Sequence, residues 1–555
     1  MCVAALGAVI IGAAAESALV VLLFAIGEML EGVAAGRARA GIRSLVAMMP
    51  RTAMRRRTDG SLEEVPADAL RRNETVLVRP GERLPCDGVI VEGQSALDES
   101  PVTGESQPVS RGPGDSVVAG SVNANAALVV RVTETGAVST LARIARMVQD
   151  AAASRGATQR FIERFSAIWT PAAMALALAV MIVPPLMFDG EWSVWVYRGL
   201  AVLLVACPCA LVISVPAAMA SGLSAGARSG LLVKGGAALE AIGTATVVAF
   251  DKTGTLTRGK PKVTDVLAAS GASREEVLAL AAAVEANSSH PLAKALVEEA
   301  RRLGLAIPPS RDAVAIPGKG VVAEVNGRSV GVGSPIWAEE DGRAIGPEFA
   351  AARDELEKAG KTVAFVYRAD QPFGVVALRD EPREDAAEGV ARLRDLGVSA
   401  VMLTGDNPRT GAAIAAGLGI KVLAGLSPAR KLDEIQAMRR DGVVAMVGDG
   451  INDAPALAAA NVGIAMGGGT TVALESADAA IMRDRVAGVP ELVELSRATL
   501  ANVKQNVAIA IGLKLVFLVT TVAGITGLWP AILADTGATV LVTLNALRLL
   551  RWRLH

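Results

Sequence analysis

Long apolar stretches alternate along the chain with segments of ordinary polarity. Four stretches reach the length of about 20 apolar residues that a membrane-spanning helix needs. They lie at 168–188, 197–219, 503–525 and 529–549. Each predicts a transmembrane helix, so the chain is expected to cross a membrane several times.

The first 35 residues are also apolar, but Glu16 and Glu28 interrupt them. They predict either one long helix, or a short helix, a break near Gly12 and a second helix from about Ala15 to Arg37. In the second interpretation the first helix has about a dozen residues, too few to cross a bilayer. The chain would then begin inside a helix, with an upstream part missing.

Basic residues border the apolar stretches on the sides that face two long polar segments, about 44–160 and 225–495. The short turns at 189–193 and 524–528 have no Lys or Arg. Because Lys and Arg concentrate on the cytoplasmic side of membrane proteins, we expect both long segments in the cytoplasm. The basic residues concerned are Arg37, Arg39, Arg43, Arg228, Lys234, Lys504, Arg548, Arg551 and Arg553.

The first polar segment, about 44–155, has the pattern of a β domain. Its stretches 74–79, 88–92 and 127–132 alternate or are β-branched, with Gly and Pro turns between them. Such stretches are typical of short strands.

The second polar segment alternates strands and helices over about 240–490. Its short apolar strands, 245–250, 400–403 and 443–447, end in Gly- and Asp-rich turns. This pattern predicts a parallel α/β sheet with a site at the carboxyl ends of its strands. A stretch at about 265–375 would form a separate, inserted lobe.

Composition narrows the class of protein further. The chain has 555 residues, 52% of them hydrophobic, and a net charge of −1, which gives no reason to expect a nucleic-acid partner. Its charged residues, 20% of the total, are placed so unevenly that a disordered chain and a purely soluble enzyme are excluded. Four cysteines, two of them in one Cys-Pro-Cys, exclude a disulfide scaffold.

The predicted strand 245–250 leads into Asp251-Lys252-Thr253-Gly254-Thr255. A carboxylate in a polar turn at a strand end can attack a phosphoryl group and form an acyl phosphate. An Asp that merely caps the turn is the alternative, but three further strand-end signals favour chemistry. Thr404 and Asp406, in Thr-Gly-Asp, offer a hydroxyl and backbone N–H groups to a phosphate, and Lys431 offers a positive charge.

The third signal is Gly448-Asp449-Gly450-Ile451-Asn452-Asp453, which offers carboxylates for Mg²⁺. Mg²⁺ prefers one or two protein carboxylates together with phosphate oxygens, and Asp251 with Asp449 would provide that pair.

With these motifs in order, the sequence resembles a P-type ATPase, whose phosphorylated motif is the Asp-Lys-Thr-Gly-Thr at 251–255. The resemblance runs from about residue 15 to the C-terminus. It implies a haloacid-dehalogenase-like phosphorylation domain with Asp251 as the phosphorylated nucleophile. It also implies Mg²⁺ on Asp251, the Thr253 carbonyl and Asp449, with Asp453 nearby.

The same family carries Thr-Gly-Glu in an actuator domain, found here as Thr103-Gly104-Glu105. A Gly-flexed loop that presents Glu105 could direct water at the acyl phosphate. Read alone, the motif would be an ordinary surface turn.

In the inserted lobe, Ser289-His290-Pro291-Leu292 contains one of only two histidines. A lone His is more often structural, but Glu285 precedes it and two Gly-x-Gly motifs follow, at 318–320 and 331–333. Gly pairs permit close backbone approach to a flat ligand. Heavy-metal P-type ATPases have a small nucleotide domain with this arrangement, so the resemblance implies that Glu285, His290, Gly318 and Gly320 bind the adenine of ATP, with 331–333 less firmly indicated.

Cys207-Pro208-Cys209 interrupts the predicted helix 197–219. Proline removes a backbone donor and frees a carbonyl, which opens the helix. Two thiolates beside that break suit a soft or borderline cation such as Zn²⁺, Cd²⁺, Pb²⁺ or Cu⁺. Two small buried cysteines at a kink are the alternative.

Lys514 and Asp535 lie inside the last two apolar stretches. Intramembrane charges are costly and usually mark function or a paired partner. Asp535 with two thiolates suits a divalent cation better than Cu⁺, and Lys514 would pair with Asp535 once the ion leaves. A purely structural ion pair is compatible with that role. The Zn²⁺/Cd²⁺/Pb²⁺ subgroup of the heavy-metal P-type ATPases, which the sequence resembles, carries a Lys and an Asp-Thr-Gly in these helices.

Glu16 and Glu28 are further intramembrane carboxylates. Glu28 is a candidate ligand at the cytoplasmic mouth of the ion path, and Glu16, nearer the opposite face, is a candidate ligand on the exit path. Interfacial glutamates without ion contact are an equal alternative.

Together these features predict an ATP- and Mg²⁺-dependent pump in the plasma membrane that exports Zn²⁺, Cd²⁺ or Pb²⁺ from the cytoplasm through an aspartyl phosphate. A Cu⁺ exporter and a membrane-anchored phosphohydrolase that no longer transports are the alternatives. Family members usually have two spans and a metal-binding domain before the position where this chain begins, so docking of a cytosolic metal donor is left open.

The expected fold is a multidomain membrane protein with an α-helical transmembrane bundle, a β-rich actuator domain, and an α/β phosphorylation domain interrupted by an α+β nucleotide-binding domain. The predicted segments are transmembrane helices 1–43, actuator 44–155, transmembrane pair 156–224, phosphorylation domain 225–264 and 376–495, nucleotide-binding domain 265–375 and transmembrane pair 496–555.

Overall fold

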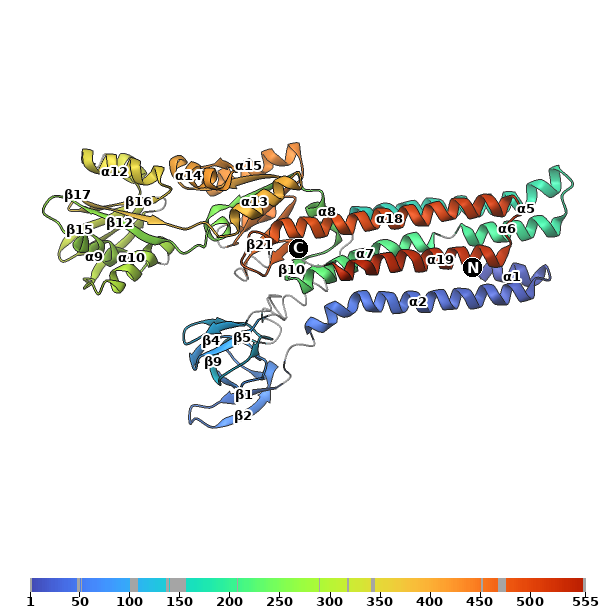
Figure 1. The fold of residues 1–555 in the computed structure, drawn as a ribbon, viewed down its shortest axis with the longest axis horizontal. Helices are drawn as coiled ribbons and strands as arrows, with labels where there is room; N and C mark the ends of the chain where they lie inside the picture. Colours follow the sequence, from blue (N-terminus) through green and yellow to red (C-terminus); the bar gives the residue numbers. More distant parts are fainter. Residues whose placement is uncertain are drawn as a thin grey trace. The chain divides into compact units, whose positions relative to one another are not determined.

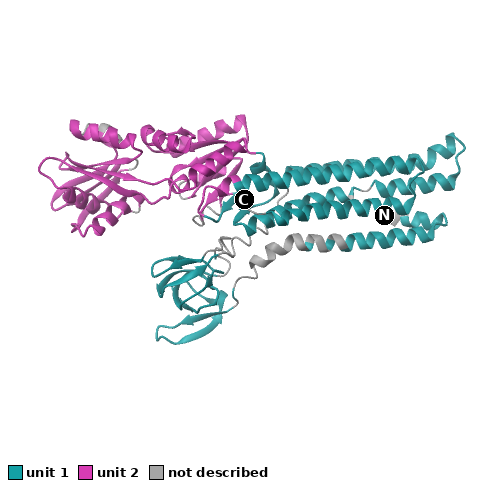
Figure 2. Ribbon diagram, in the orientation of Figure 1, with its two compact units in different colours: residues 1–244, 478–483, 491–555 teal, residues 245–477, 484–490 magenta. Residues whose placement is uncertain are grey.

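The computed structural model divides the chain into two compact units, which Figure 2 colours separately. The first comprises residues 1–244, 478–483 and 491–555 and contains the long helices and a small β domain. The second comprises residues 245–477 and 484–490 and contains an α/β domain with an inserted lobe. The structure describes residues 2–46, 50, 52–99, 108–135, 139, 156–206, 208–288, 290–316, 319–340, 345–450, 453–467 and 476–552.

The chain opens with two helices, α1 (Cys2–Ile10) and α2 (Ala14–Val46). Gly12 separates them with a φ of +86°, in the left-handed region that glycine adopts without a steric penalty. The two-helix interpretation of this apolar run is therefore confirmed. The predicted end at Arg37 was too early, since α2 continues to Val46.

Four helical spans among the described residues are long and apolar enough to cross a membrane, and they overlap the four predicted stretches. In Figure 1, α2, α6, α7 and α19 lie side by side, and their residues are in contact. The helix predicted over 197–219 is split at the Cys-Pro-Cys, as the proline predicts. The spans consist of α5 (Ala157–Met187), α6 (Trp192–Val205) with α7 (Cys209–Arg228), α18 (Gly488–Val522) and α19 (Leu528–Leu547), which a short 3₁₀ turn (Arg548–Arg551) follows.

Two glycines of α7 allow close approach of neighbouring segments. A Cβ added at Gly222 would lie 2.3 Å from Thr499 Oγ1 of α18, and one added at Gly226 would lie 2.7 Å from the Leu231 carbonyl oxygen. Small residues four apart permit such packing between membrane helices. Neither position in this part of α7 therefore has room for a larger residue.

The β domain of the first unit confirms the three predicted strands. They lie in a six-stranded sheet of order β2-β1-β3-β9-β4-β7, beside a smaller sheet of order β6-β5-β8. Its core is built by alternate, inward-facing residues such as Val76, Val78, Ile90 and Val130. The strands are β1 (Thr52–Arg56), β2 (Leu62–Pro66), β3 (Thr75–Val78), β4 (Asp87–Glu92), β5 (Ser95–Asp98), β6 (Val109–Arg111), β7 (Ser116–Val117), β8 (Val122–Asn123) and β9 (Leu128–Glu134), with a 3₁₀ turn at Ala67–Ala69.

The α/β domain has β11 (Val247–Asp251) at the centre of a parallel sheet. β18 (Ser399–Leu403) and β20 (Val444–Gly448) flank it, and all three run parallel, as predicted. Asp251 therefore lies at the edge where the carboxyl ends of three strands meet. The outer strands are β19 (Lys421–Leu423) and β21 (Val462–Met466), and the helices are α13 (Ala386–Asp395), α14 (Pro408–Leu418), α15 (Pro428–Asp441) and α16 (Ala454–Ala459). In the first unit, α8 (Gly236–Gly243) follows β10 (Leu231–Val233), which pairs with β22 (Ala479–Ile481).

The inserted lobe is an antiparallel sheet of order β12-β17-β16-β15-β14-β13, with the packed pair α9 and α10 against it. Two of its glycines make room for a buried indole: a Cβ added at Gly331 or Gly333 would lie 2.9 or 2.0 Å from Trp337. Packing explains both glycines without a ligand. The elements are β12 (Lys262–Ala268), α9 (Arg274–Glu285), α10 (Pro291–Arg302), β13 (Ser310–Ile316), β14 (Gly320–Val325), β15 (Arg328–Gly333), α11 (Pro335–Glu340), α12 (Pro347–Lys358), β16 (Thr362–Arg368) and β17 (Gln371–Arg379).

Candidate phosphorylation and ion sites

Asp251 ends β11 and is almost fully buried, with 6% of the residue exposed. Lys431 Nζ, from α15, lies 2.5 Å from Asp251 Oδ1 and 3.0 Å from Asp453 Oδ1. Burial raises the pKa of Asp251 to about 7, the charge of Asp453 adds to the rise, and Lys431 opposes it. The Lys431 ammonium thus faces two buried carboxylates. The excess of negative charge favours the binding of a further cation.

The turn after Asp251, residues Lys252–Leu256, is shaped by a glycine and held by an arginine. Gly254 has a φ of +75°, and a Cβ there would lie 2.8 Å from Asp449 Oδ2, so both conformation and space call for glycine. Arg383 donates hydrogen bonds to the carbonyls of Thr255 and Gly254, at 2.8 and 2.9 Å. Arg383 was not predicted from the sequence, where it stands out only as part of a charged stretch after β17.

Thr404 and Asp406 follow β18, the strand beside β11. The buried Thr404 hydroxyl accepts a hydrogen bond from the Asp406 backbone N–H at 3.1 Å. Lys252, the residue after Asp251, forms an ion pair with Asp406. The predicted residues of three strand ends therefore lie at one edge of the sheet, although their roles stay predictions.

This edge suits Mg²⁺. Asp449 reaches the Gly254 turn, and Asp251 shares the ammonium of Lys431 with Asp453. The Asp251 and Asp449 carboxylates with the Thr253 carbonyl are oxygen ligands of the kind that Mg²⁺ prefers. Bound there, Mg²⁺ would supply positive charge to a transferring phosphoryl group.

Lys431→Ala is expected to slow phosphorylation of Asp251 by about 10²–10³-fold, the usual cost of removing one electrostatic stabiliser from a transition state. The measurement is the rate at which label from the γ-phosphate of ATP enters acid-stable protein. Lys421→Ala, an exposed lysine on β19, should keep the wild-type rate. Equal rates in both variants would remove Lys431 from the reaction.

In the inserted lobe, Glu285 ends α9 and His290 caps α10. Glu285 Oε2 is buried and has no hydrogen-bond partner among the residues that the structure describes. Burial raises the pKa of this carboxyl, and a hydrogen bond with the Ser288 side chain opposes the rise. His290 Nδ1 accepts a hydrogen bond from the Leu292 N–H at 3.3 Å, which gives the histidine a capping role. A buried acceptor without a donor fits the amino group of adenine.

Of the two glycines predicted to contact the nucleotide, Gly318 lies outside the described residues. Gly320 lies opposite Gly333 on β15, and a Cβ on it would be 2.2 Å from the Val332 carbonyl oxygen. Close strand pairing is therefore enough to require glycine at 320.

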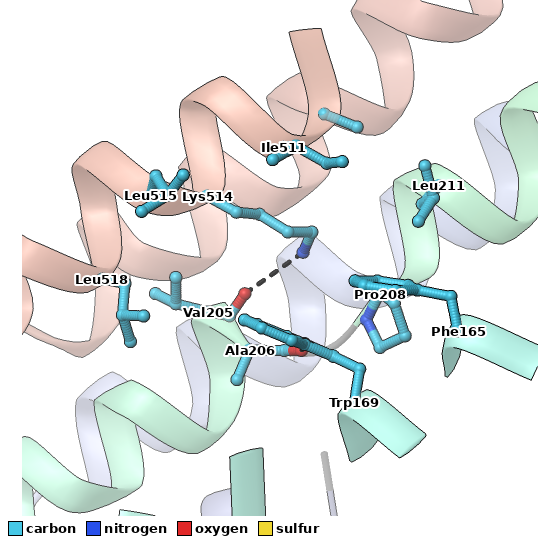
Figure 3. Close-up of a pocket in the computed structure, with 11 residues that line it drawn as sticks. Phe165, Trp169, Val205, Ala206, Pro208, Leu211, Ile511, Lys514, Leu515 and Leu518 are labelled. Carbon is cyan, nitrogen blue, oxygen red and sulfur yellow. Dashed lines mark hydrogen bonds between the residues drawn. The ribbon is translucent and has the colours of Figure 1, made fainter. Parts of the chain in front are cut away.

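The ion site contains the predicted pair of charges. Lys514 Nζ, on α18, lies 2.6 Å from Asp535 Oδ1, on α19, and both side chains are nearly buried. Lys514 also donates to the Val205 carbonyl at 3.1 Å, at the end of α6 (Figure 3). Cys207 and the side chain of Cys209 lie outside the described part of the chain.

The two glutamates of α2 have different surroundings. Glu16 accepts a hydrogen bond of 2.5 Å from the hydroxyl of Tyr197 on α6, and that hydroxyl accepts one from the Leu528 N–H at 3.0 Å. Tyr197, which the sequence analysis did not single out, thereby joins α2 and α6 to the start of α19. Glu28 is exposed. Neither position tests the proposed contacts with an ion.

Comparison with known proteins identifies the family of this chain. Residues 245–461 match the family model of haloacid dehalogenase-like hydrolases, and residues 47–149 match that of the P-type ATPase actuator domain. The chain is 52% identical to a zinc/cadmium/lead-transporting P-type ATPase of Shigella sonnei, over 100% of this chain and 75% of that protein. It is 43% identical to a cadmium-transporting ATPase of Staphylococcus aureus, over 99% of this chain and 77% of that protein.

Among solved structures, the chain resembles a zinc-transporting PIB-type ATPase in its E2.Pi state. The TM-score is 0.62 and the identity 52%, over 99% of this chain and 89% of that chain. Sequence and structure thus agree along nearly the whole length, and the chain belongs to the heavy-metal-transporting P-type ATPases.

Proposed function

We propose that this ATPase exports Zn²⁺, Cd²⁺ or Pb²⁺ from the cytoplasm, with Asp251 as the residue phosphorylated in each cycle. The observation that carries the choice of cation is the buried Lys514–Asp535 pair beside the helix break at Pro208. The proposed ligands are the two thiolates of the Cys-Pro-Cys and the Asp535 carboxylate, which together carry three negative charges. The Lys514 ammonium cancels one of them, so the site has a net charge of −2. A divalent ion balances that charge, whereas a monovalent ion leaves one charge buried and uncompensated.

In the phosphoryl-transfer step, a carboxylate oxygen of Asp251 attacks the γ-phosphorus of ATP. A bond forms between that oxygen and phosphorus, the bond to the β-phosphate oxygen breaks, and ADP leaves. Lys431, already paired with Oδ1, stabilises the negative charge on the transferring group. Glu285, His290, Gly318 and Gly320 would hold the adenine, and Thr404 and Asp406 would bind near the phosphate. Glu105 would later direct water at the acyl phosphate.

In the membrane, Cys207, Cys209 and Asp535 would bind the ion, which arrives past Glu28 and leaves past Glu16. Lys514 would retake Asp535 as the ion departs, and the two side chains lie close enough for this, with Nζ 2.6 Å from Oδ1. Movements of the cytoplasmic domains would alternate the two arrangements. A cytosolic metal donor remains a proposed partner.

The test is ATP hydrolysis by the purified, reduced protein with Mg²⁺ and one added metal at a time: Zn²⁺, Cd²⁺, Pb²⁺, Co²⁺ or Cu⁺. We expect stimulation by Zn²⁺, Cd²⁺ and Pb²⁺ and none by Cu⁺, and we expect Cys207→Ser to lose the stimulation because a thiolate ligand is gone. Stimulation by Cu⁺ alone would identify a copper exporter. Metal-independent hydrolysis that Cys207→Ser leaves unchanged would identify a phosphohydrolase without transport.

A further inference from the structure

The helix break at the ion site leaves backbone carbonyls to be satisfied. α6 ends at Val205, Pro208 has no N–H, and α7 begins at Cys209. The last carbonyls of a helix lack donors within the helix. Oxygens of Val205 and Ala206 at this point would ordinarily be free to bind water or a cation.

Two side chains from other helices hold these two carbonyls. Lys514 Nζ donates to the Val205 carbonyl at 3.1 Å. Trp169 Nε1, from α5, donates to the Ala206 carbonyl at 2.7 Å, at the short end of the range for an N–H···O bond. The Ala206 carbonyl carbon is bonded directly to the amide nitrogen of Cys207, so Trp169 acts on the peptide that enters the Cys-Pro-Cys.

The indole is itself well oriented. Its ring stacks on Phe165, one turn earlier in α5, with centroids 5.7 Å apart and planes at 16°. Both rings line a cavity of about 170 Å³ that Pro208 and Lys514 also line (Figure 3). The stacking holds the ring so that its one N–H points at the break.

These hydrogen bonds affect which atoms at the helix break can bind a cation. Carbonyl oxygens exposed by an unwound membrane helix are ligands for hard cations, and Mn²⁺, Mg²⁺ and Ca²⁺ prefer oxygen. The Val205 and Ala206 carbonyls are both bonded to N–H donors, so these two oxygens are turned away from the ion, and the proposed ligands are the thiolates and Asp535. Such a set suits soft and borderline ions.

We propose that Trp169 is a specificity-determining positioning residue, whose indole N–H withdraws the Ala206 carbonyl from the ion and so disfavours hard divalent cations. The proposal rests on the proposed function, because it assigns the metal site to the Cys-Pro-Cys. It adds a residue on α5 that is not among the ligands.

The test is Trp169→Phe, which keeps an aromatic ring to stack on Phe165 and removes only the donor. In full-length protein, the ratio of the half-maximal stimulating concentrations of Mn²⁺ and Zn²⁺ should fall about tenfold, the effect of about one hydrogen bond. Trp529→Phe, an exposed tryptophan of α19, should keep the wild-type ratio. If the substitution only loosened packing, the half-maximal concentrations of Mn²⁺ and Zn²⁺ would rise by the same factor and their ratio would not change.

A second readout is the absorption spectrum of bound Co²⁺. Four-coordinate Co²⁺ absorbs strongly and loses intensity when another oxygen binds, so Trp169→Phe should weaken the visible bands while the thiolate band persists. An unchanged spectrum and an unchanged metal ratio in Trp169→Phe, with normal Zn²⁺ stimulation, would overturn the role of Trp169 alone. Absence of Zn²⁺ stimulation and of a thiolate–Co²⁺ band in the wild type would overturn the proposed function with it.

Discussion

Asp251→Asn is expected to abolish the phosphorylated enzyme, with ATP hydrolysis reduced about 10⁵-fold or more, as for loss of other covalent nucleophiles. The amide is isosteric with the carboxylate but is not a nucleophile of comparable strength. Lys431 keeps Asp453 as a partner at 3.0 Å, so the fold of the sheet edge should survive. The measurement is acid-stable label from γ-labelled ATP.

Asp433→Asn is the matched control, because Asp433 is an exposed residue of the same helix as Lys431. It should incorporate label at the wild-type level. Label that persists in Asp251→Asn would show that another residue carries the phosphoryl group.

Asp535→Asn should raise the Zn²⁺ concentration for half-maximal stimulation at least about 100-fold. Loss of a partner outside the ligand shell already costs about 10–100-fold in metal affinity, and Asp535 is proposed to touch the ion. The variant also removes the counter-charge of the buried Lys514 ammonium. Removing one partner of a buried ion pair lowers the free energy of unfolding by about 3–5 kcal/mol. A wild-type response to Zn²⁺ would show that the proposed ion site is wrong.

The double variant Lys514→Met/Asp535→Asn separates ligand loss from instability. Replacing both members of a buried ion pair lowers protein stability far less than removing one of them. The double variant should therefore recover the thermal stability lost in Asp535→Asn without recovering stimulation by Zn²⁺. Recovery of both properties would mean that the pair is only structural.

The arrangement of the candidate phosphorylation site could be predicted largely because a parallel sheet brings the carboxyl ends of its strands together. Once Asp251, Thr404 and Asp449 were assigned to strand ends, the order of strands placed them at one edge. The helix breaks were predictable for a similar reason. Gly12 and Pro208 act through their own backbone chemistry, which the residue type alone reveals.

Arg383, Trp169 and Tyr197 could not be predicted in the same way. Each donates from a distant segment, Arg383 and Trp169 to backbone carbonyls and Tyr197 to the carboxylate of Glu16, and a carbonyl has no sequence signature. The glycines at 331 and 333 show the opposite problem. Their Gly-x-Gly pattern looks like a ligand loop, whereas the structure uses them to seat Trp337. A pattern of small residues cannot distinguish the two uses.

The Lys514–Asp535 pair has an electrical consequence. A carboxylate emptied of its cargo in apolar surroundings would ordinarily take up a proton, which would then travel inward on each cycle. The resident ammonium makes that returning proton unnecessary. In the proposed cycle the carboxylate therefore carries no proton inward, and each exported charge that stays uncompensated costs about 2.3 kcal/mol for every 100 mV of inside-negative potential. The pump is electrogenic, and slowed by hyperpolarisation, whenever fewer than two protons return on the thiolates of Cys207 and Cys209.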